Sequence, residues 1–165
     1  LTIVILSGDK DLYQLIENDH VVVEMIKNGA NETLAINETA VKNAYGLPPT
    51  ALLDYKGLVG DASDNIPGVA GVGPKAAKEL FKEFDTLEEI YDNLGLIKRT
   101  LAAKLTAGRE SAFLSKRLAT IKKDVPLSLP RLDALKTIPL DIPRLTKFFN
   151  ELGFASLVKR LAEKS

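Results

Sequence analysis

The sequence contains no cysteine and only one histidine, His20, among its 165 residues. Without cysteine the chain has neither disulfide bonds nor thiolate metal ligands, which also fits a cytoplasmic location. One imidazole is too few for a zinc site built from several histidines. Any metal ion that these residues bind is therefore held by oxygen atoms, the ligands that hard divalent cations such as Mg2+ prefer.

Long apolar runs and an excess of charge are also absent. No stretch approaches the roughly 20 apolar residues of a membrane-spanning helix, no signal peptide is visible, and we expect no membrane partner. The 22 Lys and Arg residues balance the 22 Asp and Glu residues, which argues against coating of nucleic acid through bulk charge. A net charge of zero is still compatible with a local basic surface opposite an acidic pocket. The composition, 45% hydrophobic and 27% charged, is that of one globular domain or a compact pair.

The first residues predict a buried strand. Residues 1–6 form an apolar run with several β-branched side chains, which is typical of a strand covered on both faces in a parallel sheet. Such a strand needs parallel neighbours, and few strand-like runs follow. We therefore expect the chain to be the C-terminal portion of a longer polypeptide, cut within an α/β domain. A small sheet completed by the later hairpin alone is the alternative.

The rest of the chain predicts one hairpin and then mostly helices. Strands are expected over residues 20–26 and 32–36, joined by a turn at 27–30 that contains Asn-Gly. Apolar spacing and capping residues predict helices over residues 12–16, 38–45, 50–59, 74–84, 87–94, 97–105, 111–121, 144–152 and 155–163. Residues 124–143 hold four of the prolines and are expected to be extended. The fold class expected is α/β, a remnant of a mostly parallel sheet, followed by an all-helical module.

Four aspartates occur as two short motifs, Asp9 with Asp11 and Asp61 with Asp64. The first pair follows the first strand, at the end where open α/β sheets gather their ligands. Capping of the next helix is the alternative and suffices to explain one of these two aspartates, but it does not explain both. If the fold brings the four together, their repulsion favours binding of two Mg2+ or Mn2+ ions that act on a phosphate. Asn65 is expected to orient a carboxylate or a water beside the metal.

A glycine-rich segment follows the second motif. Residues 68–73 read Gly-Val-Ala-Gly-Val-Gly, and Pro74 then opens a helix. Glycine lets backbone N–H groups approach an anion, so this hairpin predicts a cradle for the DNA backbone without sequence readout. The residues expected to contact DNA are Gly68, Gly71, Val72, Gly73, Lys75, Lys78 and Lys82. A solvated face, with the lysines paired to Glu79 and Glu83, is the alternative for the three lysines.

Several segments resemble the 5′-nuclease domain of bacterial DNA polymerase I. The first is Ser-Gly-Asp-Lys-Asp-Leu at residues 7–12, and the second is Lys-Gly-Leu-Val-Gly-Asp-Ala-Ser-Asp-Asn-Ile-Pro-Gly-Val at residues 56–69. Residues 71–77, 114–121, 124–127 and 148–157 match the family as well. The resemblance therefore extends in order over essentially the whole chain.

This resemblance implies a structure-specific 5′→3′ exonuclease and flap endonuclease that removes RNA primers in replication and repair. It implies catalytic, metal-binding roles for Asp9, Asp11, Asp61 and Asp64, and duplex binding by a helix–three-turn–helix element that contains residues 71–73. It further implies Mg2+ or Mn2+ as cofactor, a K+ ion between hairpin carbonyls and a phosphate, and duplex or flap DNA, including RNA-primed DNA, as partner. A polymerase domain and a bacterial, nucleoid-associated location are implied too.

The sequence departs from the family in one large respect. The family carries further carboxylates and a basic helical arch upstream, which are not found in these residues. We expect the chain to need that N-terminal nuclease segment and to be inactive alone. The expected domains are 1–60 for the α/β part, 61–125 for DNA binding, and 126–165 for two short helices packing back. A non-catalytic duplex-binding module is the alternative; a phosphohydrolase of small phosphates is disfavoured by the basic helices.

Overall fold

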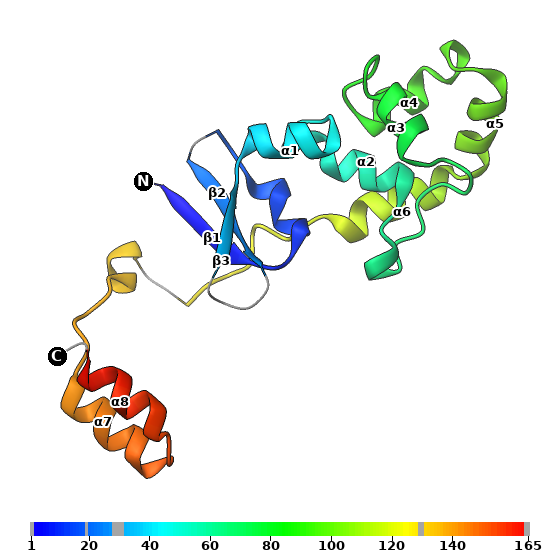
Figure 1. The fold of residues 1–165 in the computed structure, drawn as a ribbon. Coiled ribbons are helices and arrows are strands. Elements are labelled where there is room, and N and C mark those ends of the chain that lie inside the picture. The colour runs from blue at the N-terminus through cyan, green and yellow to red at the C-terminus, as the bar shows by residue number, and fades with distance from the viewer. Residues whose placement is uncertain (1, 19, 28–31, 129–130, 164–165) are drawn as a thin grey trace. The chain divides into compact units, whose positions relative to one another are not determined.

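The computed structural model describes residues 2–18, 20–27, 32–128 and 131–163. The chain divides into two compact units, residues 1–123 and 124–165, which are treated separately below (Figure 1). The turn expected at residues 27–30 lies, beyond Lys27, outside the described residues. Within the described ranges no helix has both the length and the apolar character that crossing a membrane requires.

The first unit begins with a three-stranded sheet in the order β1-β2-β3. Strand β1 (Ile3–Ser7) is parallel to β2 (Val21–Lys27), and β3 (Glu32–Ile36) is antiparallel to β2. Val23 at the centre of β2 is fully buried, where the short helices cover this face. The three expected strands are confirmed, and with the helices that follow they confirm the α/β class.

The expectation that the first strand is buried on both faces is wrong for the described structure. Ile3, Val4 and Leu6 are 47%, 53% and 61% exposed. The reason is the position of β1, which pairs with β2 on one side and forms an edge of the described sheet. The apolar run therefore predicted the strand correctly, but it did not predict how far the strand is exposed.

Four short helices accompany the sheet, one between β1 and β2 and three after β3. They are η1 (Lys10–Leu15), α1 (Glu38–Tyr45), η2 (Pro49–Ala51) and α2 (Leu52–Val59). The first is a 3-10 helix, in place of the expected α-helix. The predicted caps of α1 are confirmed, because Asn37 accepts from the N–H of Ala40 and Gly46 adopts a left-handed φ of 73°.

Helices α3 to α6 complete this unit: α6 packs along α2, α3 and α4 also contact it, and α5 lies farther from it (Figure 1). Their bounds are Pro74–Leu80, Leu87–Asp92, Arg99–Ala107 and Arg109–Ala119. The fully buried side chains at their centre include Leu58, Leu87, Ile90 and Leu105. A Cβ on Gly57 would lie 3.1 Å from the Leu87 side chain and 3.2 Å from the Ala112 carbonyl. This glycine therefore permits the close packing of α2 on α4 and α6.

Helix α3 is shorter than the sequence predicts. It ends at Leu80, so Lys82 and Phe84 lie outside it. The chain turns there because Phe84 reaches the core, at 9% exposure, and because the next helix begins soon after. Thr86 caps α4 by accepting from the N–H of Glu89, as the capping motif predicts.

The second unit contains α7 (Ile142–Glu151) and α8 (Ala155–Ala162), preceded by a 3-10 turn at Leu132–Leu135. Helix α7 begins two residues earlier than expected, because Asp141 caps the N–H of Arg144 and proline is tolerated in a first helical turn. Gly153 connects the two helices with a φ of 70°. The second unit is thus a helical hairpin after a largely extended segment.

Candidate metal centre and adjoining hairpin

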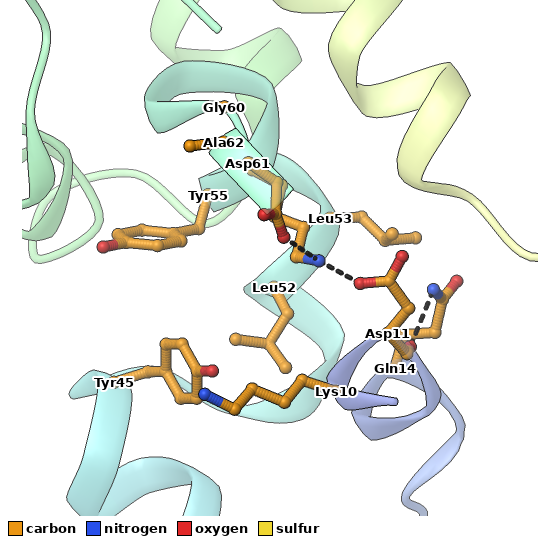
Figure 2. A pocket seen from close by; sticks show the side chains of 11 residues that line it. Lys10, Asp11, Gln14, Tyr45, Leu52, Leu53, Tyr55, Gly60, Asp61 and Ala62 are labelled. Carbon is orange, nitrogen blue, oxygen red and sulfur yellow. Dashed lines mark hydrogen bonds and ion pairs between the residues drawn. The ribbon is translucent and has the colours of Figure 1, made fainter. Parts of the chain in front are cut away.

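Three of the four predicted aspartates come together in the first unit. Carboxylate oxygens of Asp11, Asp61 and Asp64 all lie within 4.8 Å of one another. Asp11 comes from η1, whereas Asp61 caps the 3-10 turn η3 (Ala62–Asp64) just after α2. Figure 2 shows the carboxylates of Asp11 and Asp61 pointing toward one another across a pocket of about 230 Å3.

A sharp turn at the end of α2 places the second motif. Gly60 has a φ of 77°, and a Cβ at this position would lie 2.4 Å from the Ile66 carbonyl oxygen. Only glycine fits such a conformation and contact. Asp61 and Ile66 then exchange two backbone hydrogen bonds of 2.9 Å. The turn between them therefore presents its carboxylates as one fixed unit.

Lys56 completes the cluster, and the sequence interpretation overlooked it. Its ammonium donates to the Asp11 carboxylate and lies 2.8 Å from an oxygen of Asp61. The side chains of Lys56 and Asp61 are 17% and 23% exposed. The only signal in the sequence is the position of Lys56 in the last turn of the helix that delivers Asp61.

Lys56 and Asp61 shift each other's pKa values. The hydrogen bond from Lys56, helped by that from Ser63, lowers the pKa of Asp61 to about 2. Burial by itself would lower the pKa of Lys56, but its hydrogen bonds to Asp11 and Asp61 outweigh burial and raise it. Three carboxylates and one ammonium leave a formal charge of −2 near neutral pH. A divalent cation would neutralise this charge.

Asp9 and Asn65 occupy different positions. Asp9 is exposed, and its carboxylate accepts a 2.8 Å hydrogen bond from the backbone N–H of Asp11. It is the N-cap of η1 and is not one of the three clustered carboxylates. Asn65 is exposed and adopts a left-handed conformation with a φ of 55°, which asparagine tolerates well in turns. The metal roles predicted for both residues stay predictions.

The donor set suits a hard cation, because Asp11, Asp61 and Asp64 supply only oxygen atoms. A divalent ion held there would polarise a phosphate and lower the pKa of a bound water. Without a metal ion, Lys56 pairs with the first two carboxylates, and a bound cation would compete with its ammonium for them. The residues present therefore fit the expected metal.

The glycine hairpin is anchored to α6 by two serines that the sequence interpretation did not single out. The N–H of Gly68 donates to the hydroxyl of Ser115 at 2.9 Å, and the hydroxyl of Ser111 donates to the carbonyl of Gly68 at 2.6 Å. The N–H of Val69 donates to the carbonyl of Leu58 at 2.8 Å. Gly68 is therefore engaged through both of its backbone groups.

The other hairpin residues differ in their exposure to solvent. Gly71 and Gly73 are exposed, whereas Val72 is 5% exposed, so the side chain of Val72 belongs to the core. The carbonyl of Gly71 accepts a 3.0 Å hydrogen bond from Lys104 on α5. Lys104 was one of several basic residues in these helices, and its spacing in sequence gave no sign of this contact.

The three predicted lysines are not equivalent. Lys75 is exposed, and Lys78 is half-buried beside Gly46. Lys82 forms an ion pair of 2.7 Å with Glu79, which is the alternative that the sequence left open. Because α3 ends at Leu80, only Lys75 and Lys78 lie on the helix that follows the hairpin.

A glycine hairpin between helices lies next to this oxygen-donor cluster, and comparison with known proteins shows the family to which the chain belongs. Residues 47–142 match the family described as 5′-3′ exonuclease, C-terminal SAM fold. This match includes more than half of the chain, and the chain belongs to this family.

Nearly the whole chain is similar to bacterial DNA polymerase I. It is 46% identical over 163 residues to DNA polymerase I of Caldicellulosiruptor bescii, covering 98% of this chain and 19% of that protein. Identity is 40% to the Bacillus caldotenax enzyme and 38% to that of Bacillus subtilis, each over 98% of this chain and 18% of the relative. The chain therefore spans about a fifth of the length of these relatives.

Solved structures support the fold. The structure of T5 5′-exonuclease with bound divalent zinc ions is 22% identical, with a TM-score of 0.62 over 72% of this chain and 42% of that one. The catalytic core of Rad2 in complex with DNA substrate is 18% identical, with a TM-score of 0.52 over 88% of this chain and 50% of that one. At these identities the likeness concerns the fold alone.

Proposed function

We propose that the chain supplies the duplex grip and part of the metal site of a two-metal 5′ nuclease. Such an enzyme hydrolyses phosphodiester bonds at 5′ ends and flaps, as in primer removal and repair. The observation that carries the proposal is that the carboxylate cluster and the glycine hairpin adjoin each other in the chain. The clustered carboxylate of Asp64 and the anchored Gly68 lie in one short turn after α2, so a bound backbone would pass beside the metal site.

Asp11, Asp61 and Asp64 would hold Mg2+ or Mn2+, with Asp9 and Asn65 beside them. Mg2+ takes six oxygen ligands, and two ions need more carboxylates than this cluster of three contains. The remaining ligands would come from another segment of the nuclease, beside a polymerase domain in the same bacterial protein. By itself the chain would bind flap DNA and cleave it slowly or not at all.

The hairpin would contact the duplex through phosphates. Gly68, Gly71 and Gly73 would offer backbone groups, with Lys75 and Lys78 adding charge. Phosphate contacts position a protein without reading sequence, which suits an enzyme directed to a structure rather than a sequence. A K+ ion between hairpin carbonyls and a phosphate would strengthen the grip, and replacing K+ by Na+ at equal ionic strength would test this.

The metal assignment is tested with Mn2+, whose binding is followed by water proton relaxation. We expect the chain to bind Mn2+ and Asp64→Asn to weaken binding at least about tenfold, because one charged ligand is lost. Asp64 is exposed, so the fold should tolerate the change. Asp92→Asn, also exposed, is the matched control. Equal Mn2+ affinity of the two variants would refute the assignment.

A second candidate is a non-catalytic duplex-binding module. The Lys56 ammonium between Asp11 and Asp61 favours it, because an internal cation already neutralises part of the cluster. Under this alternative the chain binds duplex DNA but no Mn2+ at the cluster. The same Mn2+ titration therefore separates the two functions.

A further inference from the structure

Lys104 lies beside the hairpin although 33 residues separate it from Gly71. Its ammonium donates to the Gly71 carbonyl at 3.0 Å. A Cβ on Gly71 would lie 3.1 Å from the Lys104 Nζ and 3.3 and 3.4 Å from the two preceding carbons. The bare glycine backbone thus lets the end of this side chain rest directly on the hairpin.

The backbone of Lys104 is held firmly in the first unit. The next residue, Leu105, is fully buried, and its carbonyl accepts a 3.1 Å hydrogen bond from the Tyr91 hydroxyl. The Lys104 carbonyl accepts from the N–H of Gly108 at 2.9 Å. Gly108 in turn packs on Val69 of the hairpin, where a Cβ would come within 2.7 Å of the valine side chain. The hairpin is therefore contacted at two points, by the Lys104 ammonium at Gly71 and by Gly108 at Val69.

No carboxylate in the described part of the chain neutralises the charge of Lys104. Among residues that the structure describes, no carboxylate lies within 4.0 Å of its ammonium, whereas Lys56, Lys82 and Lys116 each have such a partner. An ammonium has three N–H donors, and the Gly71 carbonyl takes one of them. A full charge and two donors remain for a partner at the exposed hairpin.

The hydrogen bond to Gly71 also prepares this cation for binding. A free lysine side chain loses rotamer entropy when it is fixed. Here the carbonyl already restricts the end of the side chain, so less entropy remains to be lost when an anion binds. Hydrogen bonds from ammonium groups to phosphate are short and charge-assisted.

We propose that Lys104 binds a backbone phosphate of duplex DNA at the tip of the hairpin and is thereby a DNA-contacting residue on α5. This assignment rests on the proposed function and extends its interface beyond the hairpin and α3. Lys104 contributes a fixed charge without reading sequence, while its contact with Gly71 aligns that phosphate with the hairpin.

The test measures binding of labelled duplex DNA by fluorescence anisotropy over a series of salt concentrations. Each phosphate neutralised adds about 0.9 to the slope of log affinity against log salt. Lys104→Gln should weaken binding about 5- to 10-fold at low salt and lower this slope by about one. Lys104→Met, which keeps the stem against Gly71, should behave in the same way, and Lys104→Arg should keep the slope.

Lys27→Gln is the matched control, because this exposed lysine ends strand β2 and loses the same charge. Thermal unfolding should be unchanged in all four variants. Weakened binding with an unchanged slope would show that Lys104 only supports the hairpin, and affinities equal to the control would also overturn the proposal. A chain that binds no duplex at all would instead overturn the proposed function and this assignment together.

Discussion

The hydroxyl of Ser115 accepts a 2.9 Å hydrogen bond from the backbone N–H of Gly68, 47 residues earlier in the chain. Ser115 is fully buried, so water cannot replace it. This bond joins the centre of α6 to the first residue of the hairpin. The position of the hairpin therefore depends on a helix that contributes no residue to the predicted motif.

Replacing Ser115 with alanine should destabilise the chain by about 1–3 kcal/mol, because a buried N–H loses its acceptor. Duplex affinity should fall with it. Ser111→Ala is the comparison, since it removes the donor to the Gly68 carbonyl, and carbonyl groups tolerate incomplete pairing better. Urea unfolding of both variants measures the difference. A loss at Ser115 no larger than that at Ser111 would contradict the buried role of the first bond.

Gly60→Ala should cost about 3 kcal/mol or more, or prevent folding, because a Cβ would add backbone strain and a collision. That Cβ would lie 2.4 Å from the Ile66 carbonyl at a φ of 77°. Gly95→Ala is the matched control, since a Cβ there meets nothing within 4 Å. Denaturant unfolding checks both, and a tolerated alanine at position 60 would mean that the turn has another conformation.

The double substitution Lys75→Glu with Lys78→Glu should weaken duplex binding strongly while leaving the melting temperature nearly unchanged. Both residues follow the hairpin on α3, where charge reversal repels phosphates. Lys27→Glu with Lys42→Glu changes the same charge on β2 and α1 and should have little effect. Anisotropy and thermal scans measure the two properties. A large drop in melting temperature would show that these lysines are structural.

The free energy of unfolding of the chain should fall at high pH because of Tyr91. Burial raises its pKa to about 12, against a smaller lowering by Arg109, and its hydroxyl donates to the Leu105 carbonyl. Between pH 10 and 12 the unfolded tyrosine loses its proton while the folded one keeps it. The stabilisation that the raised pKa of Tyr91 provides is therefore complete below pH 10. It is lost as the pH rises toward 12, by at most about 1.4 kcal/mol per pH unit.

Tyr91→Phe should remove this part of the pH dependence, as measured by urea unfolding at pH 9 and pH 11. Burial also raises the pKa of Tyr13 and Tyr55, so some fall should persist in the variant. Tyr45→Phe should instead reduce the fall that persists, because Tyr45 contributes to the raised pKa of Tyr13 and Tyr55. An identical slope in Tyr91→Phe and in the unsubstituted chain would disprove the assignment.

Lys56→Met should lower stability without metal and increase the stabilisation that Mn2+ provides. Removal of the ammonium leaves Asp11 and Asp61 repelling each other, and a divalent ion then meets one more unpaired charge. Thermal unfolding with and without Mn2+ measures both effects, with Lys42→Met as control. A smaller rise in melting temperature on Mn2+ addition than in the unsubstituted chain would show that Lys56 supports metal binding instead of competing with it.

The sequence by itself determined the features that depend on neighbouring residues. The cap at Asn37, the left-handed Gly46, the capping of α4 by Thr86, and the three strands were all predictable. Each arises from backbone hydrogen bonds or side-chain alternation within a few positions. The resemblance of the two aspartate motifs and the hairpin to one nuclease family was visible for the same reason.

Only the tertiary structure decided which distant side chains meet. It brought Asp11 but not Asp9 to Asp61, placed Lys56 between them, and left β1 exposed at an edge. It also joined Gly68 to Ser115 and Gly71 to Lys104, across 47 and 33 residues. Such contacts result from how α2, α5 and α6 pack, and residue spacing does not encode packing between distant helices. A lysine in a row of basic residues became a candidate DNA contact only once its position beside the hairpin was known.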